Sequence, residues 1–182
     1  PSNIRIAAGQ SSFAAGCTQY VPLAGRMSGS ESCLFLNVWR PRTAEQGLPV
    51  YVWIHGGGNS IGSSSMVNEY RGTRLARRSN MVFVSLNYRL GPFGWFAHPA
   101  LREGASAEDD SGNFGTLDII QALRWIQENI SAFGGDPSTV AITGESAGGL
   151  NVLSLLVSPA AAGLFHRAIA QSPPASTRGL TE

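Results

Sequence analysis

The clearest hydrophobic pattern in this chain lies between Thr116 and Ala132. Apolar residues recur there at spacings of three and four, and they are Ile119, Ile120, Leu123, Ile126 and Ile130. This period places all of them on one side of an α-helix, as in a helix that packs its apolar side on a sheet. Gly134, Gly135 and Pro137 follow and predict its end.

Shorter apolar runs predict strands before and after this helix. The run from Cys33 to Arg40 alternates between apolar and polar residues, and further strand-like runs cover residues 49–54, 81–87, 139–143 and 166–171. Residues 68–78 and 150–157 have helical composition, whereas the acidic, glycine-rich residues 102–115 predict an exposed loop. The repeated strand–helix–strand order is typical of an α/β fold with a mostly parallel sheet and helices on both faces. No boundary divides residues 1–182, so we expect a single domain.

Composition narrows the possible partners. The chain has 182 residues, 43% hydrophobic and 14% charged, with a net charge of +1. This balance gives no reason to expect nucleic acid or an anionic membrane surface as a partner. No apolar run reaches the roughly 18 residues that a membrane span requires. We therefore expect a small, uncharged substrate.

One serine has the surroundings of a nucleophile. Ser146 lies between Gly144 and Gly148, directly after the predicted strand 139–143 and before the predicted helix 150–157. A strand-to-helix turn this tight admits only small flanking residues and exposes the serine hydroxyl above the sheet. The pattern predicts attack on a carbonyl carbon.

A second glycine cluster supplies the complementary chemistry. His55 is followed by Gly56, Gly57 and Gly58 at the end of the predicted strand 49–54. The tetrahedral oxyanion of ester hydrolysis needs backbone N–H donors that no side chain obstructs, and a glycine run offers them. Because reactive groups gather at the carboxyl ends of parallel strands, we expect both clusters in one acyl-transfer site.

The base and the acid of a catalytic triad are missing. In this type of site they follow the serine along the chain, yet after Ser146 the only histidine is His166 and the only carboxylate is that of Glu182. The helix after Ser146 leads away from the site, so His166 begins its strand more than roughly 10 Å from the serine. We expect His166 to be structural, and the base and acid to lie on polypeptide outside this chain.

The two cysteines predict a disulfide. Cys17 and Cys33 bracket a polar loop, and such a pair favours secretion or another oxidising compartment. Two reduced, buried thiols are the alternative.

Six motifs occur in a fixed order and resemble those of type-B carboxylesterases, a family of α/β-hydrolases that includes cholinesterases. They are SESCLFLNV at 30–38, HGGG at 55–58, NYRLG at 87–91, FGGDP at 133–137, GESAG at 144–148 and LFHR at 164–167. The resemblance runs from about Cys17 to Pro173. It implies the α/β-hydrolase fold and a serine carboxylic-ester hydrolase that works through an acyl-enzyme without metal or cofactor.

The resemblance also implies roles for individual residues. Ser146 is the expected nucleophile, and the N–H groups of Gly57, Gly58 and Ala147 are the expected oxyanion hole. Glu145 beside the nucleophile is expected to help order the site without being the triad acid.

Further residues are expected to support the site. His55 braces the glycine loop, the Cys17–Cys33 disulfide closes a surface loop near the substrate gorge, and Arg89 pairs with Asp136 in a buried ion pair. Asn59 stands where the family commonly has an aromatic residue, which makes it a candidate for the acyl side of the pocket.

The chain departs from the family in length and in one loop. Family members have several hundred residues, with β-structure before the Cys17 equivalent and the acid and histidine far downstream, so we expect an internal portion of a hydrolase domain. Residues 18–32 contain no tryptophan for a cation–π contact, so choline esters are an unfavourable substrate. A non-catalytic adhesion or binding ectodomain of the same fold is the alternative. A sequon, Asn129-Ile130-Ser131, offers a glycan site of limited access.

Overall fold

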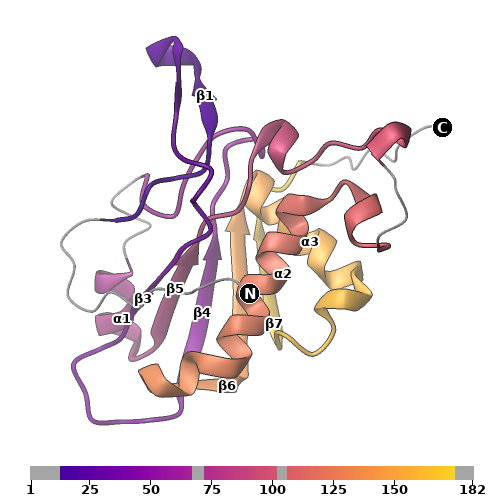
Figure 1. Ribbon diagram of the computed structural model, residues 1–182. Helices are drawn as coiled ribbons and strands as arrows, with labels where there is room; N and C mark the ends of the chain where they lie inside the picture. The colour runs from indigo at the N-terminus through magenta and orange to yellow at the C-terminus, as the bar shows by residue number, and fades with distance from the viewer. Residues whose placement is uncertain (1–12, 67–71, 102–105, 175–182) are drawn as a thin grey trace.

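A five-stranded sheet in the order β3-β5-β4-β6-β7 forms the centre of the molecule (Figure 1). The computed structural model describes residues 13–66, 72–101 and 106–174. Four strands of the sheet are parallel, and β3 joins β5 antiparallel. The expected α/β fold with a mostly parallel sheet is therefore confirmed. The strands are β3 (Leu36–Trp39), β4 (Leu48–Ile54), β5 (Val82–Leu86), β6 (Gly135–Glu145) and β7 (Arg167–Gln171).

The helices that connect consecutive parallel strands pack on the sheet. They are α1 (Thr73–Ser79), α2 (Phe114–Asn129) and α3 (Ala147–Val157). The chain moves from β4 to β5 in one direction across the sheet and from β5 through β6 to β7 in the other. Because parallel crossovers are right-handed, α1 lies on one face and α2 and α3 on the opposite face. Contacts between α2 and α3 agree with this arrangement.

The apolar stripe of α2 forms much of the core. Ile119, Ile120, Leu123 and Ile126 are at most 2% exposed, and so is Ile130 in the 3-10 turn that follows the helix. They belong to one hydrophobic cluster with side chains of β4, β5 and β6, where Val52, Val84 and Ile142 are fully buried. The periodicity of the sequence therefore predicted this helix and its buried side correctly.

The element boundaries differ from expectation in informative ways. β6 begins at Gly135, four residues before the predicted start at 139, and contains Pro137. Leu48 pairs with Gly135 but Val50 pairs with Val140, so residues 136–139 bulge opposite the single residue Pro49. A bulge accommodates proline because no ladder hydrogen bond is lost. α1 begins at Thr73, whereas the predicted helix began at 68; residues 67–71 lie outside the described residues.

The cysteines form the predicted disulfide. Cys17 and Cys33 are both buried, and they enclose a small hairpin of β1 (Gln19–Val21) and β2 (Arg26–Ser28) that projects beyond one end of the sheet (Figure 1). In the part of the chain that the structure describes, no helix has the length and apolar character of a membrane span.

Candidate active site

Ser146 occupies the turn between β6 and α3. β6 ends at Glu145 and α3 begins at Ala147, so a single residue reverses the chain, with φ 56° and ψ −122°. This conformation is unfavourable for a residue with a Cβ. It is held by hydrogen bonds from the Ser146 N–H to the carbonyl of Gln171 (2.9 Å) and from the Leu150 N–H to the carbonyl of Ser146 (3.0 Å). The side chain is half-buried.

The glycines on both sides of Ser146 are required by close backbone approaches. A Cβ on Gly144 would lie 2.3 Å from the carbonyl carbon and oxygen of Gly148, and one on Gly148 would lie 2.2 Å from the carbonyl oxygen of Ile54. Real Cβ atoms do not make such contacts, so α3 can start this close to β4 only with glycine at both positions.

The glycine loop after β4 lies against this turn. A Cβ on Gly56 would come 3.3 Å from the Cβ of Ser146 and 2.7 Å from the carbonyl oxygen of Glu145. Residues 57–61 then turn sharply, because the carbonyl of Gly57 accepts hydrogen bonds from the N–H groups of Ser60 and Ile61. Gly57 and Gly58 have φ of 109° and 62°. The fold therefore brings the two glycine clusters of the sequence together.

Backbone N–H groups in the glycine loop and at the start of α3 remain available as hydrogen-bond donors. Within the described residues, the N–H groups of Gly57 and Gly58 donate to no backbone carbonyl. Ala147 is the first residue of α3, where a helix leaves its N–H groups without intrahelical acceptors. The N–H of Ser146 itself is occupied by Gln171.

His55 is a buried neutral residue under the loop. Its ring stacks on Tyr88 with centroids 4.4 Å apart, and its Nδ1 lies 2.8 Å from the carbonyl oxygen of Gly56. Burial lowers the pKa of His55 to about 4, and the hydrogen bond to Gly56 opposes this only in part. The neutral ring donates from Nδ1 to that carbonyl, while Nε2 is buried without a hydrogen-bond partner among the described residues. This arrangement fits a brace for the loop.

The remaining histidines form hydrogen bonds with residues other than Ser146. His166 is next to Val140, with its Nδ1 accepting the Val140 N–H at 3.2 Å. Val140 is six residues before Ser146 on β6, a span of roughly 20 Å. His98 is exposed and accepts the N–H of Ala100. Within the described ranges, no histidine forms a hydrogen bond with Ser146 and no cluster of side chains is arranged to hold a metal ion.

Asn59 is bound into the structure rather than left open beside the loop. Its side-chain amide exchanges hydrogen bonds with the amide of Asn151 on α3, and its carbonyl accepts the N–H of Gly91 at 2.7 Å. The expected role on the acyl side of the pocket stays a prediction.

The expected Arg89–Asp136 ion pair is wrong. Arg89 pairs with Asp118 on α2 through two hydrogen bonds of 2.8 Å, and its backbone N–H also donates to that carboxylate. The bonds to Asp118 raise the pKa of the Arg89 guanidinium. Asp136 lies in the β6 bulge and instead accepts hydrogen bonds from the N–H and hydroxyl of Ser138. These hydrogen bonds lower the pKa of the Asp136 carboxyl.

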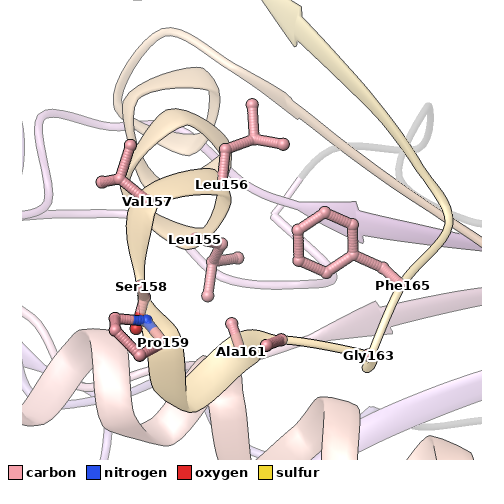
Figure 2. Close-up of a pocket in the computed structure, with 9 residues that line it drawn as sticks. Leu155, Leu156, Val157, Ser158, Pro159, Ala161, Gly163 and Phe165 are labelled. Atoms are coloured by element: carbon pink, nitrogen blue, oxygen red, sulfur yellow. The ribbon is translucent and has the colours of Figure 1, made fainter.

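An apolar hollow lies at the other end of α3. Figure 2 shows Leu155, Ala161 and Phe165 around it. Since Ser146 precedes the first turn of α3 and this hollow adjoins its last turn, the hollow is not part of the serine site.

Comparison with known proteins agrees with this geometry. Residues 7–182 match the profile of a family described as "Carboxylesterase family". The chain belongs to the carboxylesterase family. The solved structure of a PNB esterase superimposes with a TM-score of 0.77 and 44% sequence identity over 88% of this chain and 33% of that one.

Relatives in the carboxylesterase family come from distant organisms. The para-nitrobenzyl esterase of Bacillus subtilis (strain 168) is 49% identical over 143 residues, which cover 79% of this chain and 28% of the relative. The liver carboxylesterase of Sus scrofa is 48% identical over 153 residues, covering 83% and 25%. This chain therefore spans about a quarter to a third of the length of the relatives that it matches.

Sequence reasoning missed several residues that support the candidate site in this member of the carboxylesterase family. They are Tyr88, Asp118, Asn151 and Gln171, and they act through contacts with residues distant in the chain. The sequence could have indicated that Asp118 has a charged partner, because an acidic residue beside the apolar stripe of a buried helix needs one.

Proposed function

We propose that this chain carries the nucleophile and the oxyanion hole of a serine carboxylic-ester hydrolase. The observation that carries the proposal is the position of Ser146, which stands alone in a strained turn with Gly56 packed against it. Backbone strain of this kind costs on the order of 1–3 kcal/mol and persists at sites where it has a use.

In the proposed reaction the hydroxyl oxygen of Ser146 attacks the carbonyl carbon of an ester. A histidine takes the hydroxyl proton, and the carbonyl oxygen becomes an oxyanion that accepts hydrogen bonds from the N–H groups of Gly57, Gly58 and Ala147. Collapse of the tetrahedral intermediate expels the alcohol, which receives the proton, and leaves an acyl-enzyme. Water then adds by the same route, releasing the acid and restoring Ser146. Removing one such donor costs about 10²–10³ in kcat in enzymes of this kind.

The histidine and its acid are proposed to come from polypeptide outside these 182 residues. The position of His166 beside Val140 and the burial of His55 support this. Exposed apolar side chains on α3 and β7, such as Leu156, Val157 and Ile169, support a covering by further polypeptide.

Substrate and location follow as parts of the same proposal. Net charge near zero and the absence of a tryptophan in residues 18–32 favour a small uncharged ester. Glu145 is proposed to order the site. The Cys17–Cys33 disulfide supports a secreted protein or another oxidising compartment. An adhesion ectodomain would have no use for a strained serine beside free backbone donors, so the enzyme is favoured.

Labelling with a fluorophosphonate probe tests the proposal in the full-length protein that contains this chain. The unchanged protein should be labelled, and Ser146→Ala should abolish labelling while its melting temperature stays near that of the unchanged protein. Ser154→Ala, on the same helix, is the matched control and should be labelled normally. Labelling that survives Ser146→Ala would overturn the assignment of the nucleophile.

A further inference from the structure

We propose that the paired amides of Asn59 and Asn151 position the oxyanion glycines against the start of α3. Both asparagines would then be positioning residues for the hydrolysis proposed above, on which this inference rests. They are 92 positions apart in the chain and join two segments that each supply oxyanion donors.

The two side chains form a closed pair. The Nδ2 of Asn151 donates to Oδ1 of Asn59 at 3.0 Å, and the Nδ2 of Asn59 donates to Oδ1 of Asn151 at 3.3 Å. Asn151 is 3% exposed, so water does not compete for its amide. A buried amide pair of this kind is directional, because each group finds both a donor and an acceptor only in one relative orientation.

Asn59 is also fixed on its other sides. Its Oδ1 lies 3.3 Å from the hydroxyl of Tyr88, a fully buried side chain whose hydroxyl donates to the carbonyl of His55 at 2.6 Å. Its backbone has φ 55°, a conformation that asparagine tolerates better than most residues. The Gly91 N–H bond to its carbonyl completes the anchoring.

The anchored residue adjoins the part of the loop that most needs support. Gly57 and Gly58 lie in left-handed backbone conformations, and an added Cβ on Gly58 would meet nothing within 4 Å. Packing around Gly58 therefore does little to fix its N–H. Asn59 follows it directly, and Asn151 lies one turn of α3 beyond Ala147. The amide pair thus sets the distance between the loop donors and the helix donor, and hydrogen-bond stabilisation of an oxyanion depends steeply on that distance.

The test compares Asn59→Ala, Asn151→Ala and the double variant in the full-length enzyme. For p-nitrophenyl acetate we expect kcat to fall about 10- to 100-fold in each single variant while KM stays within about threefold, because the donors are misplaced in the transition state but substrate binding is retained. Inactivation by the fluorophosphonate should slow in parallel. The kcat of the double variant should lie within about threefold of the kcat of the slower single variant, because either substitution alone already removes the pair.

Two further variants separate positioning from folding. Asn59→Gly combined with Asn151→Leu removes both amides, and glycine adopts the φ of 55° at position 59 without strain, so we expect its melting temperature to stay above those of the single alanine variants while kcat stays low. Asn129→Ala removes the hydrogen bond that the Asn129 side-chain amide donates to the carbonyl of Trp125 at the end of α2. This change should leave kcat unchanged. Single variants within about twofold of the unchanged kcat, losses that multiply in the double alanine variant, or a glycine–leucine variant with the unchanged kcat would each overturn the inference. Failure of the proposed function itself is distinguishable, because fluorophosphonate labelling would then survive the Ser146→Ala substitution.

Discussion

At the scale of single residues, the site combines one residue in a strained backbone conformation with several buried polar groups that support it. Ser146 has φ 56°, and its turn is held by Gln171 and Leu150 from either side. His55 lies below, neutral and stacked on Tyr88. The chemistry that we propose thus depends on groups whose own hydrogen bonds are fixed before a substrate arrives.

His55 should make folding stability depend on pH. Its pKa is about 4 in the folded protein and 6.5 in the unfolded chain. Above pH 6.5 both states are neutral and His55 contributes nothing to the pH dependence. As the pH falls below 6.5, the unfolded chain binds a proton at His55 that the folded protein does not bind. The free energy of unfolding should therefore fall by about 1.4 kcal/mol for each unit by which the pH is lowered, until about pH 4.

Urea unfolding of the unchanged protein and His55→Asn, measured between pH 7 and pH 5, isolates this effect. The difference in the free energy of unfolding between the two proteins should change with pH, since only the unchanged protein carries the histidine. Parallel pH profiles would show that His55 is not held neutral by burial.

Asp118 should matter much more to stability than Asp136. Asp118→Ala leaves the Arg89 guanidinium without its carboxylate, and because that guanidinium is partly exposed we expect a loss of about 2 kcal/mol, below the value for a fully buried pair. Asp136→Ala removes the same charge from the half-buried β6 bulge, where Asp136 has no ion pair with a described residue, and is the matched control. Chemical denaturation of both variants measures the difference, and a larger loss in Asp136→Ala would contradict the observed pairing.

At the scale of elements, the contact between α3 and the end of β4 allows no side chain at Gly148. We expect Gly148→Ala to abolish esterase activity and lower the melting temperature, because its Cβ would force α3 away from Ile54 and move Ser146 with it. Gly47→Ala is the control, since its Cβ would meet nothing within 4 Å and adds only left-handed strain of about 1–2 kcal/mol. Full activity in Gly148→Ala, measured with p-nitrophenyl acetate, would show that this close approach is not needed.

The elements also show how far the sequence could predict the molecule. α2 was predictable because its apolar stripe is a local property, and the turn at Ser146 because small residues are required within a few positions of it. The start of β6 was not, since the bulge at 136–139 exists only opposite Pro49 on β4. The partners of Arg89 and Asn59 lie on α2 and α3, and no local pattern indicates which polar residue a folded chain brings to a given side chain.

At the scale of the whole molecule, the site is assembled at the carboxyl ends of β4, β5, β6 and β7, from residues that end these strands or follow them. Residues 55–59 supply the glycine loop, Tyr88 and Gly91 support it, and Gln171 holds the N–H of Ser146. The disulfide-bonded hairpin projects beyond the sheet (Figure 1). This organisation gives the proposed nucleophile and the proposed oxyanion donors a common frame, to which we propose that further polypeptide adds the base and acid.

The most direct test of this account is to find where the acyl group resides during turnover. The full-length enzyme is mixed with p-nitrophenyl acetate, quenched in acid within the first turnover, digested and analysed by mass spectrometry. We expect an added acetyl group on the hydroxyl of Ser146 and none in Ser146→Ala. An acyl group on another residue, or hydrolysis with no acylated peptide and no initial burst of p-nitrophenol, would contradict the account.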